Sequence, residues 1–137
     1  MIRAIVTGHS RGLGAAIANI LLARDIAVLG ISRHGNAALT ERYPQRLDEV
    51  ALDLADSAAL ARWLEKESLA GLMNGTDTLL LVNNAGLLAP VGPLPSQPPA
   101  SIAQSLACNI GAALMLAAAA AHVAAGKGNL RILHLSS

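Results

Sequence analysis

The stretch TGHSRGLG, residues 7–14, decides the fold of this chain of 137 residues. It follows the apolar run Ile2–Val6, which predicts a buried strand, and it leads into Leu13–Arg24, where apolar residues recur at helical spacing. A glycine-rich turn between a strand and a helix presents the free N–H groups and the positive dipole end of that helix to an anion. We therefore predict a phosphate-binding loop at residues 7–14.

Three glycines give this loop its shape. Gly8 permits a tight turn after Thr7, Gly12 lets the backbone approach a pyrophosphate, and Gly14 allows the helix to pack against the strand. A glycine-rich turn without a ligand is the alternative. The strand before the loop and the helix after it favour the binding function.

Short strands alternate with helices along the rest of the chain. We predict further strands at Ala27–Ser32, Val50–Leu52, Thr78–Asn83 and Arg131–Leu135, and helices at Ala55–Glu67, capped by Asp56 or Ser57, and from Ser101 to about Ala125. The proline-rich stretch from Leu87 to Pro99 is predicted as a surface loop. This alternation is typical of an α/β protein with a doubly wound parallel sheet, the Rossmann fold, in one domain spanning residues 1–137.

The fifth predicted strand lies directly before the last residue, Ser137. An apolar strand at the open edge of a sheet promotes aggregation, and natural domains usually cover it. We therefore expect the domain to be incomplete after its fifth strand.

Composition argues against several classes of function. Charged residues make up 14% of the chain, the net charge is +1, and the basic residues are scattered, so we expect no nucleic-acid partner. Cys108 is the only cysteine, which excludes an internal disulfide and a multi-cysteine metal site and favours a reducing cytoplasm. The apolar segment Gly111–Ala125 is short for a membrane span, so we expect a buried or interface helix and no membrane.

The spacing G-x-x-x-G-x-G, preceded by Thr7, resembles the short-chain dehydrogenase/reductase family. Further motifs match at the places where that family has them. The resemblance implies that Asp53 and Leu54 contact the adenine ring, that the NNAG turn (Asn83, Asn84, Ala85 and Gly86) borders the cofactor, that Asn109 is a catalytic residue, and that Ser137, at the end of HLSS, is the catalytic serine.

Each of these motifs also has a simpler interpretation. Asp53 is equally suited to capping a helix, and the NNAG turn is ordinary turn chemistry. Asn109, inside an apolar helix, is able to satisfy a neighbouring backbone carbonyl. In the family that this chain resembles, the structural and catalytic roles of the asparagine coincide, because it bends the helix and holds a water of a proton relay.

Residues near the second strand indicate the cofactor. An NAD site needs a carboxylate at the end of this strand, but Ser32 stands there, and no acid occurs between Asp25 and Glu41. Arg33 is suited to a bidentate contact with a 2′-phosphate. Arg11 is a second cation, and Ser10 adds a hydroxyl. We therefore predict NADP(H) over NAD(H).

The family's proton donor, the Tyr of a Y-x-x-x-K motif, does not occur in these residues. The only tyrosine is Tyr43, and Leu47 stands four positions later. The resemblance implies an NADPH-dependent oxidoreductase of a small carbonyl or alcohol substrate, whose identity the sequence leaves open. The alternative is a non-catalytic, regulatory NADP-binding module that senses redox state or acts through a partner. The small side chains of Ala112–Ala125 fit close helix packing, in a homo-oligomer (dimer or tetramer) or in the core.

Overall fold

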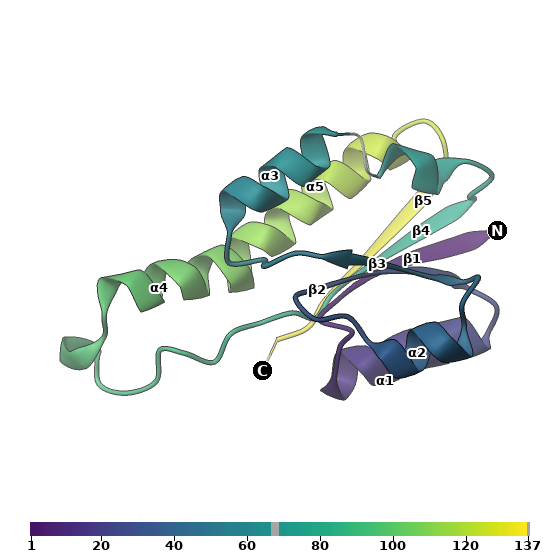
Figure 1. Ribbon diagram of the computed structural model, residues 1–137. Coiled ribbons are helices and arrows are strands. Elements are labelled where there is room, and N and C mark those ends of the chain that lie inside the picture. The colour runs from purple at the N-terminus through teal and green to yellow at the C-terminus, as the bar shows by residue number, and fades with distance from the viewer. Residues whose placement is uncertain (67–68, 137) are drawn as a thin grey trace.

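The computed structural model describes residues 1–66 and 69–136, and in these residues five strands form one parallel sheet (Figure 1). The strands are β1 (Ile2–Thr7), β2 (Ala27–Ser32), β3 (Leu47–Ala51), β4 (Thr78–Asn83) and β5 (Asn129–His134), in the order β3-β2-β1-β4-β5. The chain winds from β1 to one edge and then returns past β1 to the other. The predicted doubly wound fold is confirmed, and its switch point lies between β1 and β4.

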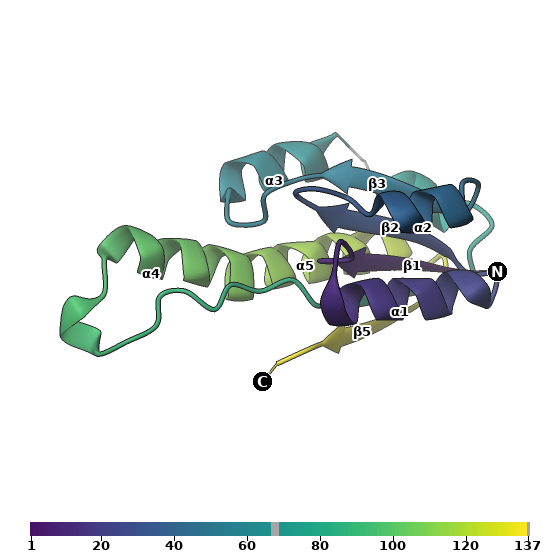
Figure 2. The same cartoon turned by 60° about the horizontal axis from the view of Figure 1, so that its bottom comes forward.

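Helices cover both faces of the sheet (Figures 1 and 2). Helices α1 (Gly12–Ala23) and α2 (Ala37–Arg42) lie on one face, and α3 (Ser57–Glu65) and α5 (Ala112–Ala124) lie on the other. Alternate residues of one strand therefore enter different cores: Ile5 packs with Leu116 of α5, whereas Val6 packs with Leu22 of α1. Strands buried on both faces are continuously apolar, which explains why β1 and β4 are easy to recognise in the sequence.

The edge strand β3 begins three residues before its predicted start at Val50. Asp48 and Glu49 are exposed on this strand, so its first half lacks an apolar signal. Helix α2 was not predicted. It has six residues and is capped by Asn36, whose side chain accepts a hydrogen bond from the Leu39 backbone N–H at 3.1 Å.

Helix α3 is shorter than the predicted range Ala55–Glu67. It begins at Ser57 because Asp56 is the N-cap, which decides between the two predicted caps, and it ends at Glu65. Glu67 lies outside the described residues. A single 3₁₀ turn, η1 (Ala70–Met73), then leads to β4.

The predicted helix from Ser101 to Ala125 has three parts that run almost in line (Figure 2). Helix α4 (Pro99–Leu106) and helix α5 are joined by a π-helical turn, η3 (Ala107–Gly111). Pro99 is thus a first helical residue and not part of the loop, a position where proline is favoured because the missing N–H needs no partner. The preceding loop also contains a 3₁₀ turn, η2 (Leu94–Ser96).

The helical run Pro99–Ala124 is, in the described part of the chain, the one helix with the length and apolar composition that a membrane crossing requires. Its second half packs on the sheet through Leu116, which is fully buried. The expectation was a buried or interface helix, and this contact buries one side of its second half on the sheet.

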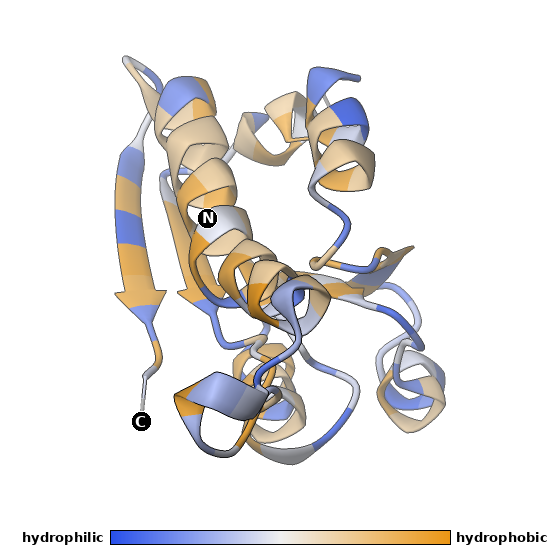
Figure 3. Cartoon of the chain, turned by 90° about the vertical axis from the view of Figure 1, so that its left-hand side faces the viewer, coloured by the Kyte–Doolittle hydropathy of each residue, from blue (hydrophilic) through white to orange (hydrophobic). Residues whose placement is uncertain are grey.

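Strand β5 forms one margin of the molecule, where hydrophilic and hydrophobic residues alternate (Figure 3). Ile132 and Leu133 are 40% and 50% exposed. The described residues therefore cover these two apolar side chains only in part.

Candidate cofactor site

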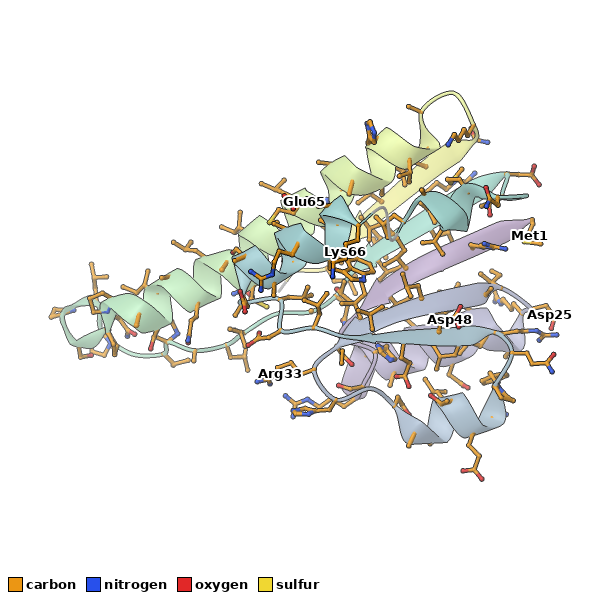
Figure 4. The ribbon with its side chains drawn as sticks, turned by 45° about the horizontal axis from the view of Figure 1, so that its top comes forward. Met1, Asp25, Arg33, Asp48, Glu65 and Lys66 are labelled. Carbon is orange, nitrogen blue, oxygen red and sulfur yellow. The ribbon has the colours of Figure 1, made fainter. Side chains whose placement is uncertain are left out.

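The site lies where the carboxyl ends of β1, β2 and β4 meet. Figure 4 shows Arg33 at this end of the sheet, whereas Met1 and Asp25 lie at the opposite end. A cavity of about 400 Å³ opens here. Its walls come from the glycine-rich loop and from the segments after β2, β3 and β4: Gly8, Ser10, Arg11, Ile31, Ser32, Arg33, His34, Gly35, Leu52, Asp53, Leu54, Ala85, Gly86, Leu87 and Cys108.

The glycine-rich loop is packed as tightly as predicted. A Cβ on Gly14 would overlap the carbonyl oxygen of Gly8, so only glycine fits. Gly12 has a φ of +57°, and no atom lies within 4 Å of the place that its Cβ would take, which leaves room for a ligand to approach its backbone. The N-cap residue of α1, Arg11, makes no side-chain cap, so the N–H groups of the first turn are free to bind an anion.

Thr7 fastens this loop to the NNAG turn. Its hydroxyl oxygen accepts hydrogen bonds from the backbone N–H groups of Asn84 and Ala85, at 3.0 and 2.9 Å. The Asn84 side chain in turn donates to the carbonyl oxygens of Thr7 and Gly8, at 3.1 and 3.3 Å. Thr7 and Asn84 therefore shape the site and do not line the cavity of about 400 Å³; Leu13 and Asn84 border a neighbouring hollow.

Asn83 does not line this cavity. Its amide donates to the carbonyl oxygen of Ala113, at 3.3 Å, and to Nδ1 of His134, at 3.1 Å. It thereby joins β4 to α5 and β5. Within the NNAG turn, only Ala85 and Gly86 line this cavity.

The predicted 2′-phosphate residues come together. Arg11 and Arg33 are both exposed and line the same cavity with Ser10. Ser32 also lines it, but its hydroxyl oxygen accepts the Gly35 backbone N–H at 2.9 Å and so shapes the turn after β2. Two cations at one cavity provide the charge that a phosphate group requires.

Asp53 and Leu54 form another wall of the cavity. The Asp53 carboxylate accepts the Ala55 backbone N–H at 2.9 Å, a local turn, while Asp56 caps the helix. Burial raises the pKa of the Cys108 thiol across the cavity, and the Asp53 carboxylate raises it further. The predicted contact of Asp53 with an adenine ring stays a prediction.

Asn109 lies in the π-helical turn, and its side chain holds the loop after β4. Its Oδ1 accepts the Leu87 backbone N–H at 2.7 Å, and its Nδ2 donates to the Leu87 carbonyl at 2.9 Å and to Ser105 Oγ at 3.1 Å. The structural interpretation of this residue is thus realised. Its catalytic role stays a prediction, and Ser137 lies outside the described residues.

A polar network behind the cavity was not predicted. His9 is fully buried, and its Nε2 contacts the Glu49 carboxylate of β3. Glu49 also accepts the Asn36 backbone N–H at 2.7 Å and the Thr40 hydroxyl at 2.5 Å. A carboxylate therefore does reach the turn after β2, although none lies there in the sequence.

The family model described as short chain dehydrogenase matches residues 3–137. The chain belongs to the short-chain dehydrogenase family. The match includes the glycine-rich loop and the NNAG turn.

Several relatives resemble this short-chain dehydrogenase. Benzil reductase ((S)-benzoin forming) of Bacillus cereus is 32% identical over 97% of this chain and 55% of its own length. The crystal structure of a short-chain dehydrogenase/reductase from Burkholderia vietnamiensis has a TM-score of 0.96 and 49% identity, over 99% of this chain and 63% of that one. A metagenomic short-chain oxidoreductase in complex with NADP has a TM-score of 0.78 and 33% identity, over 94% of this chain and 59% of that one. This chain thus spans between half and two thirds of the length of these relatives.

Proposed function

We propose that this chain is the cofactor-binding part of an NADPH-dependent oxidoreductase that acts on a small carbonyl or alcohol compound. The observation that carries the proposal is the cavity at the sheet's carboxyl edge, which joins a free helix N-terminus to two arginines. The matched metagenomic relative was crystallised in complex with NADP, which supports this cofactor. The matched Bacillus cereus relative is named a reductase, which supports enzymatic activity over a purely regulatory module.

The residues of the cavity fit the parts of NADP(H). The first-turn N–H groups of α1 would bind the pyrophosphate, and Arg11 and Arg33 would bind the 2′-phosphate. Asp53 and Leu54 would contact the adenine, and Ala85 and Gly86 would border the nicotinamide half. The bound cofactor supplies the hydride, and the protein supplies orientation and electrostatics.

The substrate would bind beside the hollow of about 510 Å³ that Asn109 shares with residues after β4 and β5. We propose that Asn109 supports a proton relay and that Ser137 donates a hydrogen bond to the substrate carbonyl. The proton donor is not assigned, because Tyr43 lacks a lysine four residues later and lies between α2 and β3. Reading the complete coding sequence for a Y-x-x-x-K motif tests this part of the proposal, and its absence would favour the non-catalytic module.

Arg33→Ala provides the direct test of cofactor choice. We expect the wild-type protein, expressed from its complete coding sequence, to bind NADPH at least about tenfold more tightly than NADH, since a bidentate charged contact is worth about that much. The variant should lose this preference while its NADH affinity stays the same, as measured by fluorescence titration. Equal wild-type affinities, or an unchanged NADPH affinity in the variant, would refute the NADP(H) assignment.

We further propose a homo-oligomer in a reducing cytoplasm. Leu106, Ile110 and Leu114 recur every four residues along α4, η3 and α5 and are 53%, 54% and 62% exposed, which gives one apolar stripe on the helix surface. A second copy of the same helix pair would cover it. Ile110→Glu should yield monomers in sedimentation experiments, and a wild-type protein that is already monomeric would refute the interface. Recovery of the protein in the membrane fraction of its cells would refute the cytoplasmic location.

A further inference from the structure

The residues His9, Asn36, Thr40 and Glu49 form one hydrogen-bonded group of side-chain and backbone atoms, here called the loop clamp. It joins the glycine-rich loop to helix α2 and strand β3, which follow the loop by more than 20 residues. His9 is fully buried under the loop, and Glu49 is 24% exposed. The clamp lies behind the cavity and not among its lining residues.

The clamp contacts the glycine-rich loop at one side chain and at two backbone carbonyl oxygens. The His9 side chain contacts the Glu49 carboxylate, while the Asn36 side chain donates to the carbonyl oxygens of His9 and Ser10, at 3.1 and 3.5 Å. Asn36 also caps α2 and donates its backbone N–H to Glu49, so it is fixed on its own side. Side chain and backbone of the loop are thereby tied to the segment that follows Arg33.

The clamped segments carry the two cations of the cavity. Arg11 follows Ser10 by one residue, and Arg33 precedes Asn36 by three. Two exposed guanidinium groups at one cavity repel each other until an anion lies between them. A backbone that is already fixed reduces the free energy spent on bringing them together when the anion binds.

The Glu49 carboxylate lies behind the turn that follows β2, and the other residues of the clamp contact its oxygens. A Cβ on Gly35 would lie 2.8 Å from Glu49 Oε2, so this charge lies directly behind the turn. Its oxygens are engaged by donors from His9, Asn36 and Thr40. A carboxylate that accepts these hydrogen bonds faces the protein's own donors and not a ligand.

We propose that the loop clamp is a positioning device that sets the spacing of Arg11 and Arg33 and so determines the preference for a cofactor with a 2′-phosphate. The proposal rests on the proposed NADP(H) function. The clamp acts on the part of the loop before Arg11, whereas the pyrophosphate would be bound at the start of α1, after it. Loosening the clamp should therefore weaken binding of the 2′-phosphate more than binding of the rest of the dinucleotide.

Asn36→Ser is the main test. Serine is also neutral and also caps helices, but it lacks the amide that donates to the carbonyl oxygens of His9 and Ser10. We expect the Kd of NADPH and of 2′,5′-ADP to rise about tenfold, the effect of one or two lost hydrogen bonds, with the Kd of NADH and of ADP changed less than about twofold. Asn74→Ser, at an exposed asparagine after η1, is the matched control and should change neither.

Glu49→Gln is the second variant, with Asp48→Asn on the same strand as its control. Loss of the carboxylate also removes a negative charge near the 2′-phosphate, which by itself would strengthen NADPH binding. If Glu49→Gln binds NADPH more weakly, the lost positioning of the arginines outweighs the lost repulsion between Glu49 and the 2′-phosphate. Unchanged or tighter NADPH binding would overturn the proposal. A merely structural role would lower the affinities for NADPH and NADH by the same factor, and this outcome would also overturn it.

The two proposals fail differently. If the wild-type protein does not prefer NADPH over NADH, the proposed function is wrong. If the wild-type protein prefers NADPH and Asn36→Ser keeps the full preference in a folded protein, as thermal unfolding would show, only the clamp proposal is wrong.

Discussion

The glycine-rich loop after β1 and the proline-rich loop after β4 both begin at the carboxyl ends of their strands, but the chain holds them in different ways. The first is fastened by buried groups, the Thr7 hydroxyl and the His9 imidazole. The second exposes Leu88, Val91 and Leu94 by 80% or more, and Asn109 holds only its first residues. The chain therefore preorganises the loop that would bind charged phosphates. A misplaced hydrogen-bond donor reduces the affinity for a phosphate more than a misplaced apolar contact would.

Gly14→Ala should have the largest effect on the tight loop. Its Cβ would overlap the Gly8 carbonyl oxygen, and backbone is unable to move aside as a flexible side chain would. We expect a loss of about 3 kcal/mol or more in the free energy of unfolding, with loss of NADPH binding. Urea unfolding measures the first quantity. Gly71→Ala, where a Cβ meets nothing within 4 Å, is the control and should change little. A fully stable Gly14→Ala would show that the loop is less tightly packed than described.

Thr7→Val should rank second. The variant keeps the shape but leaves the backbone N–H groups of Asn84 and Ala85 without their acceptor. We expect a loss of about 2–3 kcal/mol in the free energy of unfolding, the effect of unsatisfied buried donors. Thr7→Ser restores the oxygen and should recover most of the loss in the same measurement. Equal losses in both variants would mean that the Thr7 methyl group, and not its hydroxyl, matters.

The pH dependence of stability should reveal the contact of Glu49 with the tight loop. Burial raises the pKa of Glu49, but hydrogen bonds from Thr40, His9 and Asn36 outweigh it and hold that pKa below its ordinary value of 4.5. This carboxylate therefore stabilises the fold above that value, and the stabilisation is lost as the pH falls through the lowered pKa. Between about pH 5 and about pH 3, wild-type protein should lose more stability than Glu49→Gln. Parallel losses in chemical unfolding would contradict the prediction.

Asn109→Ala should have the smallest effect on global stability, because it concerns the loosely held loop. The side chain is exposed, and its hydrogen bonds hold only Leu87 of this loop and the Ser105 hydroxyl of α4. We expect less than about 1 kcal/mol of global destabilisation but faster hydrogen exchange at the Leu87 amide. Exchange at Ala85, which Thr7 holds, should not change, and a change there would mean that the two loops are coupled.

The fold was largely predictable because strands covered on both faces are apolar throughout. β1, β2 and β4 were found to within a residue, whereas the start of β3 was missed, since Asp48 and Glu49 give the first half of this edge strand no apolar signal. The π-helical turn at Ala107–Gly111 was not predicted either, because it replaces one hydrogen-bond pattern by another within a helical sequence.

The candidate site was predictable where its residues share a motif. Arg11 and Arg33 were both identified, and the structure brings them to one cavity. The clamp was not, because His9 and Glu49 are 40 positions apart and meet only through the pairing of β2 with β3. The available signal was Asn36, a typical N-cap residue before a short helix, which would have revealed α2.

The buried imidazole of His9 has an evolutionary consequence. A Cβ on Gly30 of β2 would lie 2.5 Å from two atoms of this ring. A large residue at position 9 therefore requires glycine at position 30. The two positions are epistatic: Gly30→Ala is harmful beside His9 and tolerable beside a small residue. A lineage that replaces Gly30 by a larger residue must therefore first replace His9 by a smaller one. That replacement removes the imidazole contact with Glu49.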